Sequence, residues 1–111
     1  MNKILIPKEI MFECALLAIK KKDLKLSHIA ETIGTSPSVA YSWFRNKRIS
    51  LRFAEELYEE IGYIYPEWYR EGYSVDKNIA FELLSYFKQL KENKKEEKKI
   101  SDKILRLVKR M

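Results

Sequence analysis

The spacing of apolar residues indicates helices along most of the chain. From Pro7 to Lys21 they recur every three or four positions, which is the period of an amphipathic helix over about 8–21. The same period predicts three further helices, at about 25–33, 36–46 and 51–61. In each of them the apolar residues fall on one side, so each helix would pack one face against a common core.

Local signals mark the ends of these helices. Gly34 and Gly62 each follow a helical segment, and glycine readily adopts the left-handed conformation of a helix C-cap. Ser36 and Ser50 each precede one, where a serine side chain accepts hydrogen bonds from N–H groups of the first turn. Pro37 then suits the first helical position, which needs no N–H. Short turns between consecutive helices are therefore expected.

The pattern changes after residue 62. Pro66 opens an expected short fifth helix, and Gly72 and Ser74 mark a boundary. A long helix is expected from about 76 to 92, followed by a charged stretch and a last amphipathic helix capped by Ser101. The predicted fold is all-α, with a compact five-helix domain over residues 1–73 and a helical extension over residues 74–111.

The composition agrees with this fold and narrows the chemistry. Apolar residues make up 46% of the chain, whereas glycine and proline number only three each, so a core can form but a turn-rich β fold is disfavoured. Cys14 lies in an apolar periodic segment, where a buried thiol is expected rather than a nucleophile. His28 is the only histidine, so one chain cannot assemble a metal cluster or a histidine-based triad, and a surface position is expected for it. We expect neither an enzyme nor a cofactor or small-molecule substrate.

The sequence also bears on location. No run approaches the roughly 18 apolar residues that a membrane span requires. The apolar stretch from Ile4 to Ile6 is too short for a signal peptide. A cytoplasmic protein without a membrane partner is expected.

Charge is segregated along the chain. Residues 20–52 carry eight basic and two acidic side chains, whereas residues 53–73 carry one basic and six acidic side chains. This distribution predicts one basic and one acidic side, and a basic side suits a polyanion. Chance patterning on solvated helices is the alternative.

The segment from Leu26 to Trp43 carries the functional signal. Ala30 is small, as close crossing by another helix requires, and Gly34 permits a sharp turn. A wedge of core is expected from Ile29, Ile33, Ala40 and Trp43. In a helix-turn-helix the two helices meet at about 90–120°, which projects the second helix so that its first turn can enter a major groove.

This segment resembles the helix-turn-helix of lambda-repressor-like and Cro-like phage and plasmid regulators. The resemblance covers about residues 24–62 and lies in Ala30, Gly34, the Thr35-Ser36-Pro37-Ser38 opening, and Trp43 followed by Phe44-Arg45-Asn46-Lys47-Arg48. It departs at Leu26, where many members carry a glutamine that touches the DNA backbone, and at Val39-Ala40, which inverts the usual small-then-branched order. It implies a lambda-repressor-like fold and double-stranded DNA as the partner.

On a recognition helix that starts at Ser36, one face would meet the groove. Base readout is expected from Ser38, Tyr41, Ser42 and Arg45. Contacts to the DNA backbone are expected from Ser36, Lys47, Arg48 and Arg52. Packing of Tyr41 against the first helix is the alternative for that residue.

One recognition helix reads too few base pairs for useful specificity, so such proteins pair on palindromic half-sites. The extension carries an apolar stripe suited to homodimerisation, made of Phe81, Leu83, Leu84, Phe87 and Leu90. Packing of the extension on its own domain is the alternative. An aromatic cluster is expected in the core or at the dimer interface rather than as a stacking platform for single strands; it comprises Tyr63, Tyr65, Trp68, Tyr69 and Tyr73.

The function expected from these features is that of a transcriptional regulator, a repressor that binds a palindromic operator as a homodimer. Two other functions remain open. The first is a protein-interaction module or antitoxin whose basic face meets an acidic protein. The second is a replication or packaging accessory that binds DNA without regulating a promoter.

Overall fold

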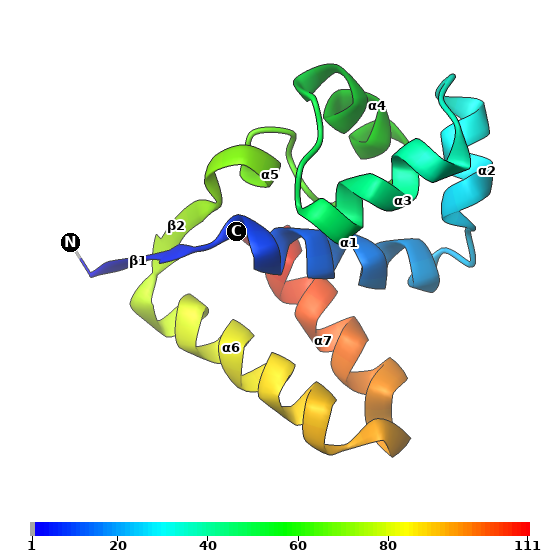
Figure 1. Ribbon diagram of the computed structural model, residues 1–111. Coiled ribbons are helices and arrows are strands. Elements are labelled where there is room, and N and C mark those ends of the chain that lie inside the picture. Colours follow the sequence, from blue (N-terminus) through cyan, green and yellow to red (C-terminus); the bar gives the residue numbers. More distant parts are fainter. Residues whose placement is uncertain (1) are drawn as a thin grey trace.

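The computed structural model describes residues 2–111, and most of them are helical (Figure 1). The helices are α1 (Lys8–Lys21), α2 (Leu26–Thr32), α3 (Pro37–Asn46), α4 (Leu51–Ile61), α5 (Trp68–Glu71), α6 (Lys77–Glu92) and α7 (Glu97–Lys109). A 3-10 turn, η1 (Lys94–Glu96), joins α6 to α7, and two strands, β1 (Lys3–Ile6) and β2 (Tyr73–Asp76), form a small sheet. The predominantly helical fold is confirmed. None of the helices within residues 2–111 has the length and apolar character to cross a membrane.

α1 is the central element of the fold. In Figure 1, α2, α3 and α4 lie on one side of it, and α6 and α7 lie on the other. Its buried side chains are Met11, Phe12, Cys14, Ala15, Ala18 and Ile19. The Phe12 ring meets Phe44 of α3 and Tyr69 of α5, with centroids 5.5 and 4.9 Å apart. The burial expected for Cys14 is thus confirmed, and α1 supports the helices that carry the predicted recognition face.

The predicted helix ends depend on the expected caps. The Ser36 hydroxyl accepts a hydrogen bond from the Val39 N–H at 3.3 Å, and Ser50 accepts one from the Phe53 N–H at the same distance. Gly62 closes α4 with a φ of +71°. These short-range interactions explain why the ends of α3 and α4 could be predicted accurately from the sequence.

The sheet corrects the expectation of an all-α fold. β1 and β2 run antiparallel, with Lys3 opposite Asp76 and Ile6 opposite Tyr73. Each strand has only four residues, too few for an alternating pattern to stand out, and the partners lie at opposite ends of the predicted domain. Gly72 leads into β2 with φ +72° and ψ −161°, a conformation nearly confined to glycine.

The C-terminal helices pack on their own chain. α7 contacts α1 and α6, and its apolar side chains are buried, namely Ile100, Ile104, Leu105, Leu107 and Val108. The stripe predicted on α6 divides: Leu83 is buried and Phe87 and Leu90 are half-buried, whereas Phe81 and Leu84 remain exposed. Most of the apolar surface assigned to dimerisation therefore covers the core within one chain.

Two expected boundaries differ from the structure. α7 begins at Glu97 rather than at Ser101, because the charged stretch supplies the 3-10 turn and the first turn of this helix. Glu97 is held by an ion pair with Lys20 of α1, a contact that no local pattern reveals. The expected division at residues 73 and 74 falls inside β2.

Candidate nucleic-acid interface

The turn between α2 and α3 is fixed by backbone hydrogen bonds. The Gly34 N–H donates to the Glu31 carbonyl at 3.2 Å, and the Thr35 N–H donates to the Ala30 carbonyl at 2.9 Å. This pair of bonds is the Schellman motif, which requires a left-handed residue after the helix end. Gly34 supplies it, with φ +86°. α2 and α3 then pack against each other (Figure 1).

One face of α3 is anchored in the core. Ala40 is fully buried, and Trp43 and Phe44 are nearly so. The Trp43 ring lies against Phe53 of α4, with centroids 5.3 Å apart. Of the remaining wedge residues, Ile29 is buried and Ile33 is half-buried, and the small Ala30 is buried as well. The expected wedge is confirmed, and Trp43 rather than Val39 accompanies the small Ala40 in the core, since Val39 is 40% exposed.

The opposite face of α3 brings together the residues predicted for base readout. Ser38, Tyr41, Ser42 and Arg45 follow helical spacing along it. Tyr41 is 52% exposed, so about half of its side chain is open to solvent rather than packed in the core. The half-buried Ser42 hydroxyl donates its only proton to the Val39 carbonyl at 2.6 Å, which leaves it able to accept but not to donate. Ser38 and Arg45 are exposed, and neither side chain has a hydrogen-bond or ion-pair partner within residues 2–111.

The residues predicted to contact the DNA backbone differ in how far their polar groups are free to bind a phosphate. Ser36 caps α3 through its oxygen, and its hydroxyl proton still points to no acceptor in the described residues. Arg48 and Arg52 are exposed, with the Arg52 guanidinium 5.5 Å from the centre of the Phe53 ring. Lys47 instead turns toward α1, where its ammonium group lies 3.5 Å from a Glu13 carboxylate oxygen.

Several lysines of the basic segment, residues 20–52, therefore interact with residues far away in the sequence. The Lys20 ammonium lies 2.7 Å from a Glu97 carboxylate oxygen. Lys21 lies 3.6 Å from Asp102 of the same helix, α7. Lys22 donates to the Glu60 carbonyl at 3.5 Å. These lysines join α1 to other elements and do not belong to the surface of α3.

Lys25 is a further candidate for a contact with DNA phosphates, and the sequence analysis did not name it. It is the N-cap residue of α2 and is exposed, with no carboxylate within ion-pair distance among residues 2–111. The start of a helix that leads into a recognition helix is a position where cations meet DNA phosphates. Its place directly before Leu26 was the signal that could have identified it.

The acidic segment and the aromatic cluster lie together. Trp68 and Tyr69 are buried, and Tyr65 is 48% exposed. The Tyr65 ring stacks on Tyr58 and meets the edge of Trp68, with centroids 5.1 and 5.0 Å apart. Trp68 also stacks on Tyr73, and Tyr69 meets Phe12 of α1, which agrees with a packing role. His28 is exposed, as expected.

Cys14 is poorly placed to act as a nucleophile. Burial raises the pKa of the Cys14 thiol to about 12, so the reactive thiolate is disfavoured. Within residues 2–111 no three metal-ligating side chains gather in one place. Comparisons of the chain with protein-family models, with curated proteins and with solved structures found no match.

Proposed function

We propose that this protein is a sequence-specific DNA-binding regulator that presents α3 to the major groove, and that it represses transcription by occupying a palindromic operator as a homodimer. The observation that carries the proposal is the exposed face of α3. It holds hydroxyl and guanidinium groups at helical spacing, while Ala40, Trp43 and Phe44 fix the opposite face in the core. A rigid helix with such groups is what base readout requires.

The roles of individual residues follow from their hydrogen-bonding capacity. Arg45 is suited to guanine, whose O6 and N7 accept both donors of a guanidinium group. Tyr41 offers a ring for a thymine methyl group and a hydroxyl for a phosphate, and Ser38 can donate or accept at a base edge. Ser42 serves only as an acceptor, because its proton is bonded to the backbone.

Backbone phosphates would hold this helix in the groove. Arg48 and Arg52 lie just beyond the end of α3 and at the start of α4, and both are exposed. The Ser36 hydroxyl and the Ser38 N–H provide neutral donors at the other end, where the helix dipole favours an anion; Pro37 has no N–H, and the Val39 N–H already bonds the Ser36 oxygen. Lys47 contributes less in this proposal than in the sequence-based expectation, because Glu13 already pairs with it.

The proposed dimer uses the outer face of α6. Phe81 and Leu84 are 52% and 42% exposed and lie one turn apart. Leu5 of the neighbouring strand β1 is 57% exposed. A two-fold contact through this face would bury apolar side chains that are otherwise in water.

The test begins with selection of bound sequences from a random duplex pool, and an enriched motif is the expected result. Arg45→Ala should then weaken binding to the selected site by about 1–3 kcal/mol, with a smaller loss on unrelated duplexes. Arg70→Ala is the matched control, since Arg70 is exposed on α5 among acidic neighbours. If the intact protein retains no duplex and binds only a protein partner, the proposal is wrong and an interaction module is the better description.

A further inference from the structure

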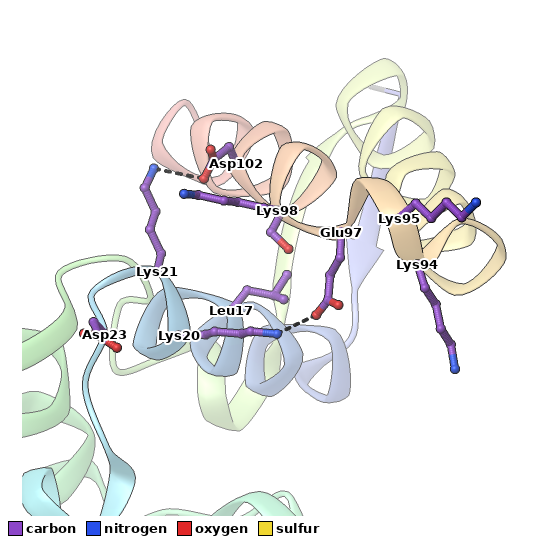
Figure 2. A pocket seen from close by; sticks show the side chains of 10 residues that line it. Leu17, Lys20, Lys21, Asp23, Lys94, Lys95, Glu97, Lys98 and Asp102 are labelled. Carbon is purple, nitrogen blue, oxygen red and sulfur yellow. Dashed lines mark hydrogen bonds and ion pairs between the residues drawn. The ribbon is translucent and has the colours of Figure 1, made fainter.

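A second basic surface lies at the junction of α1 with the C-terminal hairpin. A pocket of about 650 Å³ separates the end of α1 from η1 and the start of α7 (Figure 2). Leu17 forms its floor, and the ion pairs Lys20–Glu97 and Lys21–Asp102 cross it. Both pairs are satisfied within the chain, so Lys20 and Lys21 are not free to bind an anionic ligand.

The lysines at the rim of this pocket differ from those that cross it. Residues 91–99 contain five lysines and three glutamates. One of these glutamates, Glu97, already forms an ion pair with Lys20 of α1. Lys94 and Lys95 of η1 are exposed and extend away from the pocket (Figure 2). Neither has a carboxylate within ion-pair distance among residues 2–111. Their charge is therefore available to a partner.

This rim lies on the same edge of the molecule as the proposed recognition surface. Asp23 lines the pocket, and Lys25 and the start of α2 follow within three residues. In Figure 1 the end of α1, the helix α2, the N-terminus of α3 and η1 all lie toward the right-hand edge. Unpaired lysines thus occur at both ends of this edge, Lys25 beside α2 and Lys94 and Lys95 on η1.

From this arrangement we infer a second DNA contact, in which Lys94 and Lys95 bind backbone phosphates that flank the sequence read by α3. The inference rests on the proposed function. The end of α1 and the start of α2 connect the two sites along this edge, so a duplex held at α3 can extend toward η1 (Figure 1). The contact adds affinity without sequence readout, because phosphates carry no base information.

The experiment uses the full chain and the selected palindromic site in two lengths, a short duplex that ends with the palindrome and a long one that extends about 10 base pairs, or one helical turn, beyond it on each side. The double variant Lys94→Ala/Lys95→Ala should lower the slope of log affinity against log salt by about four on the long duplex, because the proposed dimer carries four such lysines, each worth roughly 0.9 per phosphate. Between 50 and 200 mM salt, that change makes the wild-type protein lose on the order of 100-fold more affinity than the variant. On the short duplex, which cannot reach η1, the two proteins should behave alike.

Lys3→Ala/Arg70→Ala is the matched control. It removes two exposed positive charges from β1 and α5, which lie away from η1 in Figure 1. If this control lowers the salt slope as much as the η1 variant does, only net charge matters and the second contact is refuted. An unchanged slope for the η1 variant also refutes it, while Arg45→Ala continues to report on the proposed function. Should the wild-type protein bind neither duplex, both proposals fail together.

Discussion

Gly72 is the position where one added methyl group should cost most. The residue has φ +72° and ψ −161°, and a Cβ atom there would overlap the Ile6 carbonyl oxygen. The same Cβ would also lie 3.2 Å from the Lys8 nitrogen. All of these neighbours are backbone atoms, so relief requires the start of α1 to move away from β2. Gly72→Ala therefore combines backbone strain of about 1–3 kcal/mol with overpacking of about 1–3 kcal/mol.

Gly34→Ala is the control that separates these two costs. Gly34 also has a positive φ, +86°, but no atom lies within 4 Å of the position its Cβ would take. This variant should lose only the backbone part, about 1–2 kcal/mol. At about 4 °C per kcal/mol for a chain of this size, Tm should fall by roughly 4–8 °C for Gly34→Ala and by about 8–24 °C for Gly72→Ala.

Thermal unfolding followed by circular dichroism measures both shifts. Equal Tm values for the two variants would refute the close approach of Gly72 to Ile6, and with it the described entry into the sheet. The comparison is informative because both substitutions add the same methyl group and restrict the unfolded chain to the same extent.

Two further predictions concern pH and association. The unfolded Cys14 thiol ionises near pH 9.0 while burial holds its folded pKa at about 12, so stability should fall as pH rises from 9 toward 12, by up to about 1.4 kcal/mol per unit. Melts from pH 8 to 11 measure this, and Cys14→Ala should delay the onset to near pH 10, where unfolded Tyr69 begins to ionise. Phe81→Gln/Leu84→Gln should convert a dimer into a monomer by light scattering and weaken binding to a palindromic site, whereas Leu16→Gln, also at an exposed leucine, should do neither. A wild-type protein that is already monomeric, or a double variant that still dimerises, would contradict the role proposed for α6.

Truncation is a poor substitute for these α6 substitutions. A chain ending after Tyr73 would lack most of β2 and all of α7. The apolar side chains of α7 are buried partly against α1, so their removal would expose core surface. A change in oligomeric state could then follow from unfolding or aggregation rather than from loss of a dimer contact.

The sequence predicted those parts of the fold that local interactions determine. Ser36, Pro37 and Ser50 start helices through contacts within one turn, and Gly34 and Gly62 end them. The exposed face of α3 was equally predictable, because burial of Ala40, Trp43 and Phe44 leaves only one side of the helix for solvent.

The features that were missed depend on partners far along the chain. The pairing of Lys3 with Asp76 leaves almost no trace in two four-residue segments. The apolar stripe of α7 would look the same whether it covered α1 of its own chain or a second subunit. The ion pairs of Lys20, Lys21 and Lys47 likewise join distant elements, so counting charges along the chain overstated the basic surface near α3.

The position of β1 has a consequence for the order in which a growing chain can fold. β1 is synthesised before its partner β2, and α7, which covers part of α1, is synthesised after both. Residues 26–61 can form their local turns as they leave the ribosome, but α1 completes its packing only once α7 has followed. The synthesis of α7 therefore sets the earliest moment at which the packed core can exist, and folding should be slower than in a bundle of purely local contacts.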